Sequence, residues 1–411
     1  METGKRICQA LKELRKRIAD ANEIPFEIEI CTHMGDCPGT CPKSFNQREQ
    51  EGKTVVIAVP SDSAFAAIIA KELLAETDGN IVFSPAGLCR VLEMLQAGMD
   101  ENSPIYERVS DLIGRFNSDM EPVDKESFKL EHASSIWYNQ SLGIIKEDYV
   151  DELENVYDAE AHHADFTQKK FTKLMIDKWV SDNTHQMIKS LDTEISQEAM
   201  MLVLDAIYMK GKWENPFDPD YTETDTFHNA DGSEAEVEMM YQNIEEAAYV
   251  ETDDYQLIHL PYQNNAYRMV LVLPKEGVAI DSVMERTDWI SQGTADCEVD
   301  LYMPRFNFDN TLSFKDILTA LGLGDMFEKE DSFPYITDEP AQISEIKQQC
   351  VINVEEEGTE AAALTMAKLD LGCPPPDEFP EPVTMKLDRP FGFAIKGEYD
   401  QLLFMGILKQ M

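Results

Sequence analysis

The sequence predicts an α+β fold, in which helices come first and strands dominate from about Leu202 onward. Two observations carry this prediction. A chain of 411 residues, 43% of them apolar, is long and apolar enough to bury a large core. Apolar residues recur at helical spacing early in the chain and in strand-like runs later, and this segregation of helices from strands is typical of the α+β class.

The first residues are expected to form a part of their own. Over residues 5–21, four apolar residues recur at helical spacing among lysines and arginines, which predicts an amphipathic helix. After Pro25 the sequence becomes rich in turns and cysteines. We therefore predict an N-terminal extension over residues 1–50 and a main domain over residues 51–411, with residues 46–53 as the linker.

The extension contains a candidate zinc site made of Cys31, His33, Cys37 and Cys41. Tight turns of glycine and proline between cysteines let several sulfur atoms converge on one ion. Ser44 stands where a conventional zinc knuckle has its fourth cysteine. Either His33 or Cys8 completes the ligand set, or the site is vestigial.

The main domain is expected to open with a short strand over residues 55–59, followed by a helix. The chain passes through Pro60 to a helix cap at Ser61 or Asp62 and then to an apolar helix from Ala64 to Ala75. The cysteines of this domain are far apart in the sequence and indicate no disulfide framework; they are Cys89, Cys297, Cys350 and Cys373.

Residues 356–367 look like a strand that has no large side chains to bury. Every second residue from Thr359 is small and uncharged: Thr359, Ala361, Ala363, Thr365 and Ala367. Because alternate side chains of a strand point to opposite faces, one face of this segment is smooth enough to slide between two existing strands. The alternative is an alanine-rich helix, since Ala, Leu, Met and Glu all favour helices.

The residues that follow favour the strand interpretation. The chain runs through Gly372 into three prolines, Pro374 to Pro376, which favour an extended conformation. We therefore expect an exposed loop of roughly 30 residues, from Gly358 to the next apolar strand near Phe391. A loop of that length within a compact domain is usually functional.

This region resembles the serpin family of protease inhibitors. Residues 351–363 resemble the family's hinge, and residues 388–395 with 403–406 resemble its C-terminal strands. Further similar segments follow in the family's order, so the resemblance covers about residues 61–411; they are 80–85, Trp137, 157–160, 165–166, 178–180, 183–184, 204–217, 260–262, 269–274 and 303–306. The resemblance implies a serpin fold, with a large central β-sheet, surrounding helices, smaller second sheets and an exposed reactive-centre loop.

The resemblance also implies a mechanism. A target protease cuts the loop as a substrate, and the hinge then inserts into the large sheet as a new strand, so that a serine or papain-like cysteine endopeptidase is trapped as a covalent acyl-enzyme. The hinge residues would be Glu356, Gly358, Thr359, Ala361, Ala363, Thr365 and Ala367, with Gly358 providing a free bend. Such a protein is not an enzyme and needs no cofactor for inhibition.

The usual loop length of the family places the scissile bond within Leu371, Gly372 and Cys373. If Gly372 directly precedes the bond, papain-like proteases and to some extent subtilisins would read Leu371 one residue upstream. A shift by one residue would present Leu371 itself to a chymotrypsin-like or subtilisin-like enzyme. Asp370 and Lys368 are further alternatives.

The resemblance places Ser84, Asp205, Trp213 and Gln348 at the shutter and breach, where the sheet parts. Three positions in this region depart from the family pattern: Asp205 replaces Asn, Gln348 replaces His, and Gly87 stands where Ser is common. Because glutamine donates and carboxylate accepts, we expect a compensating hydrogen bond between Gln348 and Asp205.

Composition excludes several partners. The net charge is −43, with carboxylates spread along the chain, so the basic footprint of a nucleic-acid-binding protein is missing. The residues around Phe171 carry few cations, so no heparin site is evident. The sequence contains no apolar run of signal-peptide or transmembrane length, which favours a cytoplasmic protein without a membrane partner; an extracellular location, common in the family, is the alternative. We expect a monomer.

No catalytic constellation is evident. The run from His162 to Asp165 has residues suited to acid/base or metal chemistry, but the resemblance places Asp165 in a structural turn with both histidines in a solvated approach to it. Two alternatives to an inhibitor are a serpin-like protein that binds a partner or ligand without trapping proteases, and a protein in which residues 1–45 sense zinc or thiol state.

Overall fold

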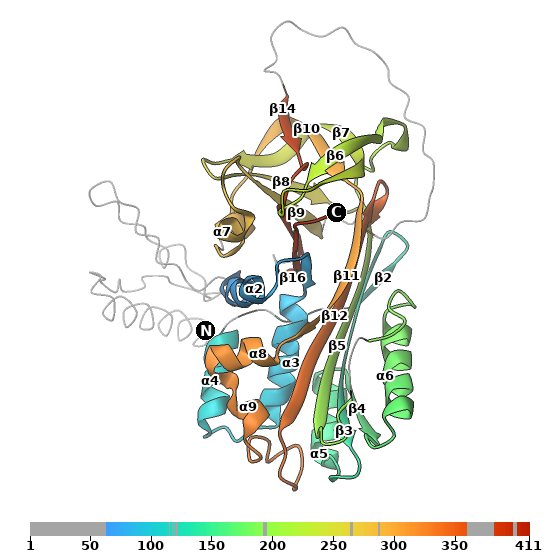
Figure 1. Ribbon diagram of the computed structural model, residues 1–411, viewed down its shortest axis with the longest axis vertical. Helices are drawn as coiled ribbons and strands as arrows, with labels where there is room; N and C mark the ends of the chain where they lie inside the picture. Colours follow the sequence, from blue (N-terminus) through green and yellow to red (C-terminus); the bar gives the residue numbers. More distant parts are fainter. Residues whose placement is uncertain are drawn as a thin grey trace, which may run out of the picture. The chain divides into compact units, whose positions relative to one another are not determined.

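The computed structural model describes residues 63–411, apart from residues 115, 117, 119, 121, 192–194, 264–265, 287, 360–381 and 398–400. These residues form two β-sheets with helices packed around them (Figure 1). The α+β class predicted from the sequence is confirmed. Within the described residues, no helix is long and apolar enough to cross a membrane.

The first sheet has seven strands. Its order is β11 (Phe306–Ser313), β12 (Ile343–Glu355), β13 (Gly358–Thr359), β5 (Met201–Lys212), β3 (Phe128–Asn139) and β2 (Val123–Lys125), with β4 (Ala159–Ala164) paired to β3. Most neighbours are antiparallel, but β5 and β12 run parallel to each other, as do β3 and β4. β13 lies between the parallel strands β5 and β12 at one end of this pair.

The second sheet has nine strands and lies near the other end of the described domain. Its order is β1 (Ile81–Phe83), β16 (Leu402–Leu408), β15 (Phe391–Lys396), β9 (Arg268–Pro274), β8 (Tyr255–Pro261), β7 (Glu234–Glu251), β10 (Ala295–Pro304) and β14 (Val383–Lys386), with β6 (Glu223–His228) paired to β7. Residues 269–273 of β9 are all at most 1% exposed, because strands lie on both sides of β9 and side chains cover both its faces.

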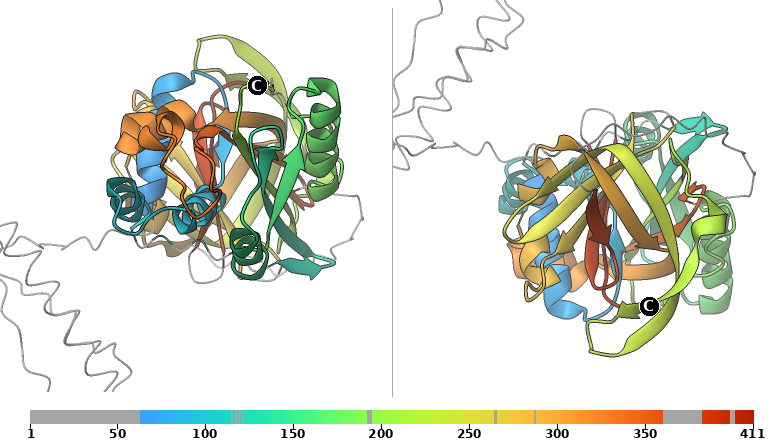
Figure 2. Two further views of the ribbon diagram at one scale, coloured as in Figure 1. Left: turned by 90° about the horizontal axis from the view of Figure 1, so that it is seen from below. Right: turned by 90° about the horizontal axis from the view of Figure 1, so that it is seen from above.

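Helices cover both faces of the seven-stranded sheet (Figures 1 and 2). Helix α6 (Lys169–Asn183) packs on one face through its own small hydrophobic cluster, which includes Trp137 and Leu204. Helix α3 (Pro85–Ala97) lies on the other face within the main core. The remaining helices are α2 (Ser63–Glu76), α4 (Pro104–Ile113), α5 (Glu147–Val156), α7 (Ile280–Met284), α8 (Lys315–Leu318) and α9 (Asp325–Glu328), with short 3₁₀ or π segments at Pro219–Tyr221, Asp288–Ser291 and Thr319–Leu323.

The sequence prediction was right for the helix at residues 64–75, which is α2, but too simple for the order of elements. Four strands, β1 to β4, precede Met201, and three helices, α7 to α9, follow it. Strand β3 was not recognised because polar residues such as Glu131, His132, Ser134 and Ser135 interrupt its apolar pattern. Two of these polar residues, His132 and Ser134, contact Asp205 of β5.

Candidate functional site

The candidate site is the seam between β5 and β12. Over Ile343–Gln349 the strand β12 pairs directly with β5 over Met201–Ala206, in parallel. At the far end of the seam the two strands are separated, and β13 pairs antiparallel with both: Thr359 lies opposite Val354 and Gly211, and Gly358 opposite Glu355 and Lys212. The seam is therefore closed at one end and already holds two residues of a third strand at the other.

Gly358 fits this position because it has no side chain. A Cβ atom at residue 358 would lie 2.0 Å from the carbonyl oxygen of Gly211 and 2.8 Å from the Cα of Lys212. These are backbone atoms of β5, which cannot move without disturbing the sheet. The structure places Gly358 in strand β13, where it permits close backbone approach; that it also provides a free bend for the hinge stays a prediction.

Thr359 is the first residue of the small-residue face, and it is 3% exposed. Its hydroxyl lies 2.8 Å from the hydroxyl of Tyr262, whose ring stacks on Trp213 with 4.7 Å between centroids. Burial raises the pKa of Tyr262, so its hydroxyl is neutral. The side chain of Thr359 is thus buried on one face of the sheet.

Trp213, at the end of β5, holds the backbone before β13. Its indole nitrogen donates to the carbonyl oxygen of Glu355 at 3.1 Å, and its backbone N–H donates to that of Glu357 at 2.9 Å. The backbone N–H of Phe217 donates to the carbonyl of Glu356, also at 2.9 Å. Three consecutive carbonyl groups of the hinge are therefore bound by the loop that follows β5.

Glu356 is held by its side chain as well. Arg305 Nε lies 2.8 Å from both carboxylate oxygens, a second guanidinium nitrogen contacts one of them, and the hydroxyl of Thr222 donates at 2.7 Å. The residue is 6% exposed. Burial raises the pKa of the Glu356 carboxyl, but the hydrogen bonds from Arg305 and Thr222 outweigh burial, so its pKa lies below the ordinary value. The carboxylate is charged and fixed.

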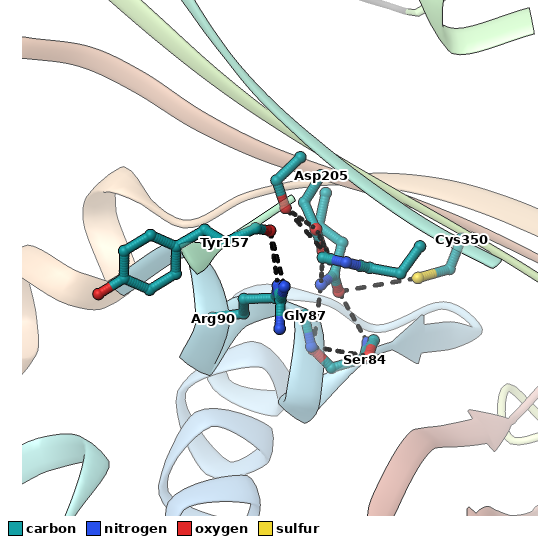
Figure 3. A network of polar contacts seen from close by, with 9 residues as sticks. Ser84, Gly87, Arg90, Tyr157, Asp205 and Cys350 are labelled. Atoms are coloured by element: carbon teal, nitrogen blue, oxygen red, sulfur yellow. Dashed lines mark hydrogen bonds and ion pairs between the residues drawn. The ribbon is translucent and has the colours of Figure 1, made fainter. Parts of the chain in front are cut away.

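A second polar cluster lies in the closed part of the seam (Figure 3). The amide of Gln348 donates to Asp205 Oδ2 at 2.7 Å, so the hydrogen bond expected between these residues is present. The same side chain binds the backbone of Ser84, donating to its carbonyl at 3.0 Å and accepting from its N–H at 2.7 Å. Gln348 therefore ties β12 both to β5 and to the start of α3.

The third departure from the family pattern has a steric reason. A Cβ atom at Gly87 would lie 2.2 Å from Asp205 Oδ2 and 3.0 Å from the amide nitrogen of Gln348. The carboxylate of Asp205 thus occupies the space that a side chain at residue 87 would need. The backbone N–H of Gly87 instead caps the helix by donating to the hydroxyl of Ser84 at 3.0 Å.

Asp205 has two partners on strand β3 that were not predicted from the sequence. His132 Nε2 lies 2.6 Å from Asp205 Oδ1, and the hydroxyl of Ser134 donates to the same oxygen at 3.0 Å. Both side chains come from the polar middle of β3, and Asp205 is 3% exposed. On the β12 side, the thiol of Cys350 lies 3.7 Å from Gln348 Oε1. Burial, and then the charge of Asp205, raise the pKa of Cys350, so it is a neutral thiol.

The four residues predicted for shutter and breach therefore fall in two places. Gln348 contacts both Ser84 and Asp205, whereas Trp213 lies with the hinge near the other end of β5. Several predicted residues lie outside the described residues: Ala361, Ala363, Thr365, Ala367, Leu371, Gly372, Cys373, Cys31, His33, Cys37 and Cys41. The predicted boundary between residues 50 and 51 also lies there.

No alternative chemistry emerges where the structure describes the chain. His162 and His163 lie in strand β4, which leads directly into the turn at Asp165, and His162 stacks on Trp137 with 4.3 Å between ring centroids. Asp165 does form the expected turn, accepting from the N–H and hydroxyl of Thr167. Within the described ranges, no three His, Cys, Asp or Glu side chains are placed to hold a metal ion.

Comparison with known proteins agrees with this geometry. The family model for "Serpin (serine protease inhibitor)" matches residues 60–410. A serine protease inhibitor of Cyanea capillata is 29% identical over 80% of this chain and 91% of its own length. Two solved structures share the fold: Serpin48 of the insect Tenebrio molitor (TM-score 0.75, 24% identity, 85% of this chain and 97% of that chain) and thyroxine-binding globulin in complex with thyroxine (0.73, 22%, 85% and 98%).

Proposed function

Because this chain belongs to the serpin family, we propose that it inhibits an endopeptidase as a suicide substrate. The target cuts the loop between β13 and β14, the segment after Thr359 inserts between β5 and β12, and the protease remains attached as an acyl-enzyme. The principal support is β13 itself, whose two residues already lie between these strands and pair with both.

The geometry of the seam supports insertion of further residues. Strands β5 and β12 run parallel, and β13 is antiparallel to each, so a longer β13 would turn one parallel contact into two antiparallel ones. Antiparallel pairing is slightly more stable per residue. Insertion adds roughly ten to twenty interstrand hydrogen bonds at about 1 kcal/mol net each, and the uncut form persists because a barrier separates it from the inserted one.

The side chains of the loop also support insertion. Thr359 is buried on one face of the sheet, and alternation sends Ala361, Ala363, Thr365 and Ala367 to that same face. None of these is larger than threonine, and overpacking at such a site costs about 1–3 kcal/mol. A segment with this pattern enters a packed sheet without displacing its neighbours.

We further propose that the scissile bond lies within Leu371, Gly372 and Cys373. The target is then a serine endopeptidase of the subtilisin-like or chymotrypsin-like class, or a papain-like cysteine endopeptidase. Incubation with one enzyme of each class, followed by denaturing gel electrophoresis and mass spectrometry of the released peptide, tests both statements. We expect a detergent-stable adduct and a cut within residues 371–373; a cut before Ala367 would contradict the assigned bond.

A matched pair of variants tests insertion directly. Thr365→Arg places a charge on the inserting face, so we expect cleavage without adduct. Met366→Arg changes the neighbouring residue on the opposite face, so we expect the adduct to form. In the wild-type protein, cleavage should also raise the melting temperature markedly. Cleavage that produces neither adduct nor stabilisation would exclude the trap and favour a binding protein without inhibitory activity.

A further inference from the structure

Strand β14 holds the C-terminal end of the loop. Residues 360–382 connect Thr359, in the seam, to Val383, at the start of β14. β14 has four residues and, among the described strands, pairs with β10 alone, through Val299–Tyr302. An edge strand this short has few backbone hydrogen bonds, so its other contacts determine whether it stays in the sheet.

One such contact comes from a buried side chain of β8. Gln256 is 8% exposed, and its amide nitrogen donates to the carbonyl oxygen of Thr384 at 3.0 Å. The backbone N–H of Leu387 donates to Tyr302 of β10 at 2.9 Å, so alternation turns the backbone groups of Thr384, three residues earlier, away from β10. In the order of the sheet, β7 and β10 separate β8 from β14. The hydrogen bond from Gln256 therefore ties β14 to the sheet at its open edge.

A series of hydrogen bonds fixes the orientation of the Gln256 amide. Its nitrogen also donates to the hydroxyl of Tyr249 at 2.8 Å, and this hydroxyl donates to Glu251 Oε2 at 2.9 Å. Glu251 pairs in turn with Lys275. These side chains meet because β7 and β8 pair in a register that puts Gln256 opposite Glu251, two residues from Tyr249.

The charge states of these residues decide which atoms donate. The hydrogen bond from Lys275, followed by that from Tyr249, lowers the pKa of Glu251, so this residue is a carboxylate and only accepts. Burial raises the pKa of Tyr249, so its hydroxyl keeps the proton that it donates to Glu251. The hydroxyl oxygen is left to accept from Gln256. This contact directs the amide nitrogen of Gln256, and with it the second N–H, to β14.

We propose that Gln256, oriented by Tyr249 and Glu251, is a positioning residue that holds β14 in the sheet and thereby keeps the uncut loop from inserting into the seam. The effect on insertion rests on the proposed inhibition, whereas the anchoring of β14 does not. Insertion without cleavage draws the loop towards the closed end of the seam and therefore pulls on β14. Cleavage breaks this connection, so the bond from Gln256 opposes insertion of the uncut chain only.

Two other contacts of β14 leave this role to Gln256. Lys386 pairs with Asp225 of β6 at 2.8 Å, but the two side chains are 36% and 38% exposed, and an exposed ion pair contributes little. Met385 is fully buried. Both contacts remain in a variant that lacks the Gln256 amide, so such a variant isolates the contribution of this one hydrogen-bond donor.

The test compares two variants of the full-length, uncut protein. Gln256→Met keeps the length of the side chain and removes its donors. Gln96→Met is the matched control, because Gln96 also donates to one backbone carbonyl and one hydroxyl, those of Tyr106 and Ser110. Both variants should lose similar stability in denaturant unfolding. Amide hydrogen exchange at residues 383–387 should rise about fivefold in Gln256→Met only; a factor of five corresponds to about 1 kcal/mol, the net value of one hydrogen bond.

A second measurement tests the consequence for the loop. On prolonged incubation, uncut Gln256→Met should convert several-fold faster than Gln96→Met to a form that melts at a higher temperature and no longer presents its loop to a protease. Tyr249→Phe, which removes the orienting hydroxyl, should raise exchange at residues 383–387 by a smaller factor.

The possible failures are distinguishable. Exchange at residues 383–387 that is unchanged in Gln256→Met, or equal in both methionine variants, would overturn the anchoring of β14. Faster exchange without conversion would overturn the effect on insertion. If cleavage also failed to stabilise the wild-type protein, the error would instead lie in the proposed inhibition.

Discussion

Replacing Gly358 with alanine tests how much the pre-inserted strand β13 contributes. The structure leaves no space for the added methyl group, since a Cβ there would lie 2.0 Å from a backbone oxygen of β5. Two outcomes are possible for the variant. Either β13 stays in the seam under strain, or β13 leaves the seam.

The smaller of the two penalties sets the expected effect. Overpacking within the seam costs about 1–3 kcal/mol. Release loses the hydrogen bond between Thr359 and Tyr262 and the pairing of two residues with two strands; at ~1 kcal/mol for each of roughly three bonds, this is about 3 kcal/mol. We expect the uncut protein to lose about 1–3 kcal/mol of stability. If the strain exceeds the cost of release by ~2 kcal/mol, β13 leaves the seam in the uncut variant, and the strain met on insertion then slows insertion about 30-fold.

Two measurements check this prediction. The melting temperature of uncut Gly358→Ala should fall by a few degrees, and more protease cleavages should be needed for each adduct formed. Gly79→Ala is the matched control, because nothing lies within 4 Å of the added atom and both quantities should stay at wild-type values. If Gly358→Ala behaved like Gly79→Ala, β13 would not be the start of insertion.

Three further predictions concern the hinge carboxylate, the polar cluster and the extension. Because the pKa of Glu356 is lowered in the folded protein, its contribution to stability is complete above the unfolded-state pKa of about 4.3 and is lost as pH falls through the folded-state pKa. The rate of proteolysis at the hinge should therefore rise on acidification. Arg305→Gln should raise this rate at neutral pH and weaken its dependence on pH. His132→Ala removes a partner of buried Asp205 and should cost about 1–3 kcal/mol in denaturant unfolding, whereas His185→Ala, at an exposed histidine paired with Glu131, should cost less than 1 kcal/mol; equal losses would contradict the assignment. Purified protein should contain one zinc ion per chain, lost in a Cys31→Ser, Cys37→Ser double variant; metal-free wild-type protein would show the candidate site to be vestigial.

The strand position of Thr359 was predictable from sequence because its signal is local. A run of small side chains at every second residue reads as an inserting strand without any knowledge of its neighbours. The bond between Asp205 and Gln348 was also predictable, but only through the resemblance to a family, since 143 residues separate the two positions.

The supporting partners were not predictable, because they depend on strand register. His132 meets Asp205 only because β3 pairs with β5 in a register that places Ser134 opposite Asp205. Arg305 lies in a segment noted for its resemblance, yet nothing in its neighbours indicates that it reaches Glu356. The bond from Gln256 to Thr384 depends on how β8 and β14 meet across the sheet, which leaves no mark in the pattern of apolar residues.

The way in which buried polar atoms are shared across the seam bears on the proposed insertion, which requires β5 and β12 to separate while the rest of the domain stays folded. When β5 and β12 separate, Asp205 loses Gln348 but stays with His132 and Ser134 on its own side. Gln348 keeps both backbone groups of Ser84. The polar groups on each side of the seam thus keep hydrogen-bond partners of their own. Within this cluster, only the hydrogen bond between Gln348 and Asp205 joins β12 to β5. Because few side-chain hydrogen bonds cross the seam, the two strands can separate in one large rearrangement while the rest of the interior stays packed.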